Sequence, residues 1–168
     1  MRTANTAAIQ VKRSSAPDLE AYSELLRTGE PEPYAYAMLL GLDRLGLPRL
    51  LREIERGLPF RAFERLAKNI GLPNERLLRL VDISRRTLVR RRTEGRFLPD
   101  ESDRMLRTAR VFAAALSLFE GDRESALSWL EEPQLAFGGA MPLDIARTEV
   151  GAREVEDLAY RLEHGVFS

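Results

Sequence analysis

The stretch NERLLRLVDISRRTLVRRRTEG, residues 74–95, decides the fold of this 168-residue chain. It predicts two short helices, one capped by Asn74 and the other by Ser84, joined by a turn of only a few residues. Four apolar side chains are placed to lock the first helix across the second: Leu77, Val81, Ile83 and Leu88. Two short helices with so tight a connection are typical of a helix-turn-helix.

The second predicted helix is rich in arginine. Residues 84–96 hold six arginines and one glutamate, and a guanidinium can bond phosphate or the O6 and N7 edge of guanine through paired hydrogen bonds. A charge run is usually only a solvated helix face, but its place on the second helix of the pair favours DNA binding. We expect base-edge contacts from Arg85, Arg86 and Arg90, with Thr87 beside them. We expect phosphate contacts from Arg91, Arg92 and Arg96.

The remainder of the chain is predicted to be helical as well. Apolar residues recur at helical spacing in segments that begin at Asp18, after the 31–33 turn, at Pro99, after Asp122 and near Thr148. These and the intervening segments end at Gly29, Gly46, Gly57, Gly71, Gly95, Pro133 and Gly165. No stretch alternates as a β-strand does. The predicted fold class is all-α.

Charge divides the chain although the formal net charge is zero. Residues 1–74 carry 11 basic and 9 acidic side chains, residues 75–110 carry 11 and 6, and residues 111–168 carry 4 and 11. This asymmetry predicts two different partners, only one of them anionic. We predict a flexible tail over 1–17, a helical extension over 18–57, the helix-turn-helix domain over 58–110, and a second helical domain over 111–168.

The residue types argue against an enzyme. The chain has no cysteine and one histidine, His164, which excludes disulfides, thiolate metal sites and His–His metal sites, and disfavours a Ser–His triad. The pairs Glu131–Glu132 and Glu156–Asp157 are consecutive, so they point to different helix faces and make no acid–base dyad. We therefore predict no catalytic residue, no metal and no cofactor.

The sequence also predicts a cytoplasmic protein without a membrane partner. No apolar run approaches the roughly 20 residues needed to span a bilayer, and no signal-peptide core follows Met1. The absence of cysteine agrees with a reducing compartment.

The acidic C-terminal part holds a second candidate site. PQLAFGGAMP, residues 133–142, predicts a loop in which Gly138 and Gly139 permit a sharp turn or a close backbone approach. Trp129 is expected in the core. The helix from Thr148 to Gly165 is predicted to bury Ala152, Val155, Leu158, Ala159 and Leu162, and to leave outward Arg153, Glu156, Tyr160, Arg161 and His164. Gly165 would redirect the apolar tail 166–168 away from the domain.

The chain from about residue 60 to 168 resembles the Xre/MbcA/ParS antitoxins of type II toxin–antitoxin systems. The motifs that carry the resemblance are TLVRR at 87–91, LPDES at 98–102, WLEEP at 129–133, GGAMPLD at 138–144, TEVGAREV at 148–155 and the closing GV at 165–166. The fifty C-terminal residues are the more specific part.

The resemblance implies an Xre-like DNA-binding domain followed by a small helical toxin-binding domain. The first implied partner is a RES-domain toxin, which depletes cellular NAD and whose active site the antitoxin shields. The second is operator DNA, which the DNA-binding domain binds to repress the operon. The residues expected to contact the toxin are Leu135, Phe137, Gly138, Gly139, Tyr160, Arg161, His164, Val166, Phe167 and Ser168. Phe167 would fill an apolar part of the NAD cleft, and the carboxylate of Ser168 would meet its cationic groups.

We further expect a homodimer, because one helix-turn-helix buries too little DNA for specific binding. Two rival functions stay open. One is a stand-alone helix-turn-helix regulator whose C-terminal domain encloses a small ligand, and the other is an enzyme that uses carboxylates alone.

Overall fold

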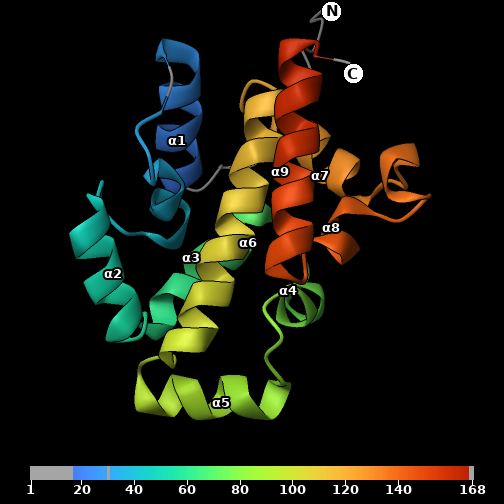
Figure 1. Ribbon diagram of the computed structural model, residues 1–168. Coiled ribbons are helices and arrows are strands. Elements are labelled where there is room, and N and C mark those ends of the chain that lie inside the picture. The colour runs from blue at the N-terminus through green and yellow to red at the C-terminus, as the bar shows by residue number, and fades with distance from the viewer. Residues whose placement is uncertain (1–16, 30, 167–168) are drawn as a thin grey trace, which may run out of the picture.

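The computed structural model describes residues 17–29 and 31–166, and the fold of these residues is all-α (Figure 1). The elements are α1 (Pro17–Thr28), the 3-10 helix η1 (Ala35–Leu40), α2 (Leu47–Glu55), α3 (Phe60–Ile70), α4 (Asn74–Leu80), α5 (Arg85–Glu94), α6 (Pro99–Leu118), α7 (Arg123–Glu131), the 3-10 helix η2 (Leu135–Phe137), α8 (Pro142–Ile145) and α9 (Glu149–His164). In these ranges β-structure is confined to two isolated bridges. The predicted fold class is confirmed.

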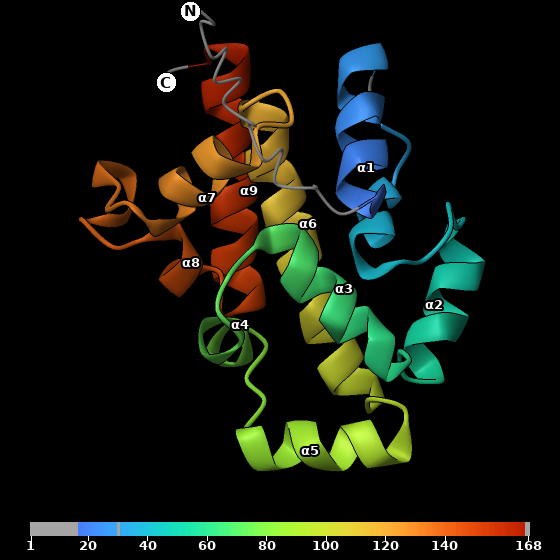
Figure 2. The ribbon, with the colours of Figure 1, turned by 180° about the vertical axis from the view of Figure 1, so that it is seen from behind.

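Helix α6 is the central element. It starts beside α5 at one end of the molecule and runs to the C-terminal helices at the other (Figures 1 and 2). It packs against α2 and α3 on the way, and against η1, α7 and α9. The apolar stripe predicted along it is buried at Met105, Ala109, Phe112 and Leu116, and only Phe119 at its end is partly exposed.

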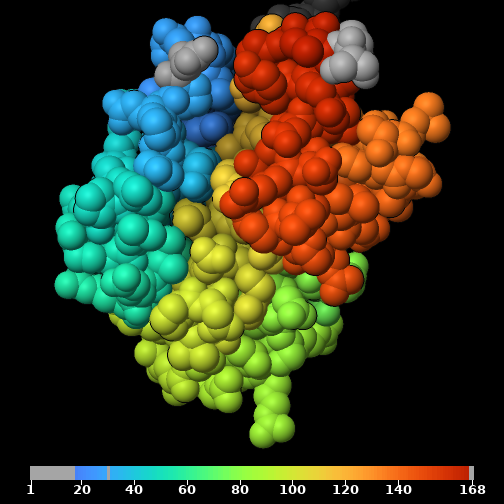
Figure 3. All heavy atoms as spheres, in the orientation of Figure 1, coloured from blue at the N-terminus to red at the C-terminus, as the bar shows by residue number. Residues whose placement is uncertain are grey.

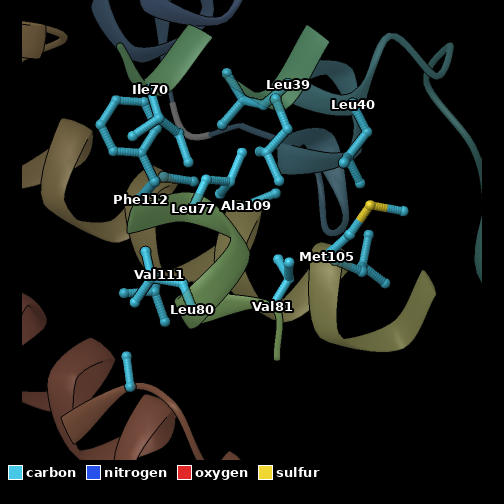
Figure 4. Close-up of a cluster of buried hydrophobic side chains, with 14 of the residues drawn as sticks. Leu39, Leu40, Ile70, Leu77, Leu80, Val81, Met105, Ala109, Val111 and Phe112 are labelled. Atoms are coloured by element: carbon cyan, nitrogen blue, oxygen red, sulfur yellow. The ribbon is translucent and has the colours of Figure 1, made fainter. Parts of the chain in front are cut away.

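One continuous core joins the two halves of the chain. Side chains from η1, α3, α4 and α6 meet in it (Figure 4), including Leu39, Ile70, Leu77 and Phe112. The same core continues through Leu116 to Trp129 and Val155 in the C-terminal helices. The border predicted between residues 110 and 111 falls inside α6, so the two predicted domains share a helix rather than a linker.

Three helix termini follow the predicted capping chemistry. The side chain of Ser84 accepts a hydrogen bond from the amide of Thr87 at 3.1 Å, and that of Asp122 accepts one from Glu124 at 3.0 Å. Thr148 does the same for Gly151 at 3.1 Å. These bonds satisfy amides that a helix start leaves without intrahelical partners.

Several local predictions are wrong. The segment predicted to run to Gly46 is only the short η1, because Gly41 takes a left-handed backbone (φ 69°) and ends it. Asn74 does not cap α4, since the extended Pro73 stands at that position and Asn74 is already helical. The predicted loop 133–142, by contrast, is confirmed apart from the short η2 within it, and α8 begins at Pro142, where the missing amide costs nothing.

None of the helices in the described part of the chain is long and apolar enough to cross a membrane.

Candidate nucleic-acid and partner interfaces

The helix-turn-helix is built from α4, the turn 81–84 and α5. Asp82 takes the left-handed backbone at φ 50°, which short polar side chains tolerate, and this reverses the chain. The amide of Ile83 then bonds the carbonyl of Leu78 at 3.0 Å. The predicted locking contacts are confirmed, because Leu77, Val81 and Ile83 are buried and Leu88 is partly buried against them.

Helix α6 fixes this turn through Arg104. Its Nε donates to the carbonyl of Val81 at 2.7 Å, and Nη2 lies 3.5 Å from the carbonyl of Asp82. Asp100, one turn earlier, holds the same guanidinium at 3.0 Å. The carbonyl groups at the end of α4 thereby gain charged donors, and the angle between α4 and α5 is tied to α6.

Arg91 belongs to the protein interior, so its predicted phosphate contact is wrong. The residue is only 4% exposed. Its Nε and Nη2 donate to the two carboxylate oxygens of Glu101 at 2.7 and 2.9 Å, and Nη1 pairs with Glu94. Burial opposes ionisation of Glu101, but hydrogen bonds from Arg91 and from the amide of Leu98 outweigh it and lower its pKa. The paired guanidinium and carboxylate anchor α5 on α6.

The opposite face of α5 is exposed and lies across one end of the molecule (Figure 1). Because Leu88 and Arg91 point inward, the 100° step of the helix turns Arg86, Val89, Arg90 and Thr93 outward. In the described ranges Arg86 and Arg90 make no ion pair. Arg85 at the start of the helix is exposed and pairs with Glu75 of α4 at 2.7 Å.

The remaining predicted DNA contacts lie at the margins of this face. Thr87 is partly buried and accepts a hydrogen bond from the Ser84 hydroxyl at 3.0 Å. Arg92 is exposed beside α3, 3.7 Å from Glu64 and 5.3 Å from the centre of the Phe60 ring. Arg96 is exposed and donates to the carbonyl of Gly57. We call the exposed set Arg85, Arg86, Val89, Arg90 and Arg92 the arginine face.

Val89 is the member of this face that sequence reasoning missed. It is 67% exposed on a helix whose other outward residues are polar. The sequence run does not reveal it, because adjacent helix positions lie only 100° apart and Val89 could share the apolar side with Leu88, as Leu77 and Leu78 do in α4.

The loop after α7 forms the first part of the predicted partner surface. The amide of Gln134 bonds the carbonyl of Ala140 at 3.0 Å, which closes the loop at its base. Gly138 and Gly139 have φ of 63° and 86°, and nothing lies within 4 Å of where a Cβ would stand, so they serve the sharp turn and not a close approach. Leu135 is 97% exposed, and the loop projects from the body (Figure 3).

Helix α9 forms the second part. Ala152, Val155 and Ala159 are buried against α6 as predicted, and Leu158 and Leu162 are partly buried. The prediction for Glu156 is wrong. It does not face outward but is partly buried and pairs with Arg110 of α6 at 2.7 Å, beside the 2.8 Å pair of Arg110 with Glu149. Burial raises the pKa of Glu156 despite its arginine partner.

The last turns of α9 carry an exposed aromatic pair. The rings of Tyr160 and His164 stack with centres 4.0 Å apart, and His164 Nδ1 lies 2.9 Å from the Tyr160 carbonyl. Arg161 and Val166 are exposed beside them, while Phe167 and Ser168 lie outside the described residues. Figures 1 and 2 place this end of α9 and the Leu135 loop apart, so the structure does not gather the predicted toxin contacts into one cluster.

Comparison with known proteins assigns both halves. Residues 49–110 match the antitoxin Xre-like helix-turn-helix domain, and residues 114–165 match the antitoxin Xre/MbcA/ParS C-terminal toxin-binding domain. An Antitoxin Xre of Yersinia enterocolitica is 38% identical over 149 residues, covering 85% of this chain and all of the relative. An Antitoxin Xre of Photorhabdus laumondii is 34% identical over 122 residues, covering 72% of this chain and 82% of the relative. The chain belongs to the Xre antitoxin family.

Proposed function

We propose that this protein neutralises a RES-domain toxin by covering its NAD-binding active site, and that it represses its own operon through the arginine face. The observation that carries the proposal is the separation of two exposed surfaces on one body. The arginine face lies at one end of α6, and the Leu135 loop and the aromatic pair of α9 lie toward the other. No residue of this scheme performs catalysis, and it requires neither metal nor cofactor.

The DNA-binding half of the proposal is supported by charge and by rigidity. Arg86 and Arg90 project from α5 without a protein partner among the described residues, so binding DNA breaks no ion pair of theirs. Arg91 and Arg104 meanwhile hold α5 and the turn on α6. A helix fixed in this way presents its side chains to the major groove in one orientation, as base readout requires.

The toxin-binding half is supported by exposed apolar and aromatic side chains in the matched toxin-binding domain. Leu135 is almost fully exposed on a closed loop, and Tyr160 stacks on His164 at the end of α9. Exposed side chains of this kind act as anchors in protein interfaces. The RES identity of the toxin and its depletion of NAD rest on the family resemblance, as does the role of residues 166–168 in the cleft.

The rival function, a regulator that senses a small ligand, has less support. The apolar pocket lined by residues such as Ile70, Phe112 and Leu143 measures about 10 Å³, room for no more than a single water. The larger hollows in the described part of the chain are open and lined by charged side chains. Small-molecule sites enclose roughly 300 Å³ or more.

We place the protein in the cytoplasm, where its proposed partners act, and expect it to bind the operator as a homodimer. Two copies of the arginine face would then meet two half-sites about one helical turn apart.

The test is co-expression with a RES-domain toxin encoded beside the antitoxin gene. The full chain should preserve cellular NAD and growth, and the purified protein should retard its own promoter fragment. A variant that lacks residues 166–168 should lose protection while it keeps promoter binding. Unchanged protection by this variant would assign the blockade to the Leu135 loop and α9, and failure of the full chain to protect would overturn the toxin assignment.

A further inference from the structure

One apolar side chain stands in the middle of the arginine face. Val89 follows Arg86 by three residues and precedes Arg90 and Thr93, and all four point outward from α5. Its exposed fraction of 67% is the largest of any apolar side chain in the described helix-turn-helix. Leu88, its neighbour, supplies the contact with the core.

The fold gives no reason for a valine here. Val89 belongs neither to the core nor to the partly buried residues packed against it, and a β-branched residue costs helix stability relative to Ala, Arg or Lys. Scattered exposed apolar residues are ordinary on protein surfaces, so it is the location of Val89 that matters. It is flanked by two guanidinium groups without protein partners, on the helix that a helix-turn-helix presents to base edges.

We propose that Val89 packs against the 5-methyl group of a thymine in the major groove of the operator. This inference rests on the DNA binding proposed above and adds one base that the protein selects. In the major groove thymine presents a C5-methyl group that cytosine lacks, and apolar side chains read it by contact. Arg86 and Arg90, on either side, would supply hydrogen bonds to guanine edges or phosphates, which a valine cannot make.

The experiment removes first the methyl group of the DNA base and then the two γ-methyl groups of Val89. The full chain selects a binding sequence from a random duplex library, and each thymine of that sequence is replaced singly by deoxyuridine, which pairs alike but lacks the methyl. At one thymine per half-site the wild-type Kd should rise about fourfold, the factor that corresponds to ~0.8 kcal/mol for one buried methyl group. Val89→Ala should bind the thymine and deoxyuridine duplexes equally.

Val150→Ala is the matched control. Val150 is the same residue type, 74% exposed at the start of α9 and outside the arginine face. Its variant should keep the wild-type preference for thymine. The ratio of the Kd for the deoxyuridine duplex to the Kd for the thymine duplex is compared between wild type and Val89→Ala. If this ratio is the same in both proteins at every thymine, the inference is overturned while DNA binding stays intact.

Two further outcomes are informative. Selection of 5-methylcytosine over thymine at this position, from a library that contains both, would assign the methyl group to a modified cytosine and overturn the thymine contact. If the full chain selects no sequence and binds no duplex, the proposed DNA binding fails, and the role of Val89 fails with it.

Discussion

Adjacent arginines of α5 have opposite roles, and the reason lies outside their own helix. Arg90 and Arg91 are indistinguishable in the sequence run, but a 100° step places the first in solvent and the second against Glu101 of α6. Local sequence could predict that α5 is cationic. It could not predict which guanidinium is buried, because the deciding carboxylate arrives from ten residues later through tertiary packing.

Substitution of the exposed arginines should separate base contacts from phosphate contacts. Arg86→Ala should weaken binding to the selected duplex by about 1–3 kcal/mol and relax selection at one base pair, because it removes a paired hydrogen bond to a base edge. Arg92→Ala should weaken all duplexes alike and reduce the salt dependence by about one phosphate contact. Fluorescence anisotropy over a salt series measures both. Native affinity and salt slope in an Arg85→Ala/Arg86→Ala variant would show that α5 is not the DNA-reading helix.

The carboxylate of Glu101 should make folding sensitive to acid. Its pKa is lowered in the folded protein from the ordinary 4.5, so its stabilisation is complete above that pH and is lost as the pH falls through the lower folded value. Glu101→Gln should lower stability by about 3 kcal/mol at pH 7, the usual cost of breaking a buried ion pair. Its thermal midpoint should vary less than that of wild type between pH 6 and 3.

Circular dichroism melts at each pH measure this effect. Asp103→Asn is the matched control, an acid-to-amide change at an exposed position of the same helix. An equal loss of stability in both variants would mean that the Arg91–Glu101 pair does not anchor α5.

At the scale of elements, the sequence predicts helix ends better than helix contacts. Caps such as Ser84, Asp122 and Thr148 act on amides two or three residues away, so their chemistry is visible in a short window. The close approach of α8 and α9 is not. A Cβ on Gly151 would stand 1.8 Å from the carbonyl oxygen of Ile145, and nothing near Gly151 in the sequence reveals that neighbour.

Gly151→Ala should therefore destabilise the C-terminal part. The added methyl overlaps backbone, which cannot yield as a flexible side chain would, so α8 and α9 must separate at a cost of about 1–3 kcal/mol. Urea unfolding followed by the fluorescence of the single tryptophan, Trp129, measures the change. Val150→Ala, one residue earlier and exposed, should leave the midpoint nearly unchanged. A Gly151→Ala midpoint equal to wild type would mean that the two helices are less closely packed than described.

At the scale of the whole molecule, charge predicted a division of the chain that agrees with the two matched family domains, but could not reveal that they form one packed body. The change from basic to acidic composition near residue 110 coincides with no break in structure, because α6 continues through it. Its first half supports α5 through Glu101 and its second half supports α9. We attribute the surface charge of each region to its proposed partner, whereas the buried stripe from Met105 to Leu116 belongs to the core that both regions share.

A shared core should unfold in one step. Leu77→Ala, in the helix-turn-helix core, should lower stability by about 2–5 kcal/mol through the cavity it leaves. The midpoints seen by Trp129 fluorescence and by helical circular dichroism should shift by the same amount. A shift in circular dichroism that leaves the Trp129 transition in place would show that the two halves unfold independently.

The central claim is that one rigid chain serves DNA and toxin through separate surfaces. The most direct test measures the NAD content of cells that express the RES-domain toxin together with an Arg86→Ala/Arg90→Ala variant. Both proteins are expressed from an unrelated promoter. The account predicts that this variant no longer binds its own promoter fragment, yet keeps NAD at the level maintained by the wild-type chain. A fall of NAD to the level of cells without antitoxin, with the variant folded and expressed as wild type, would contradict it.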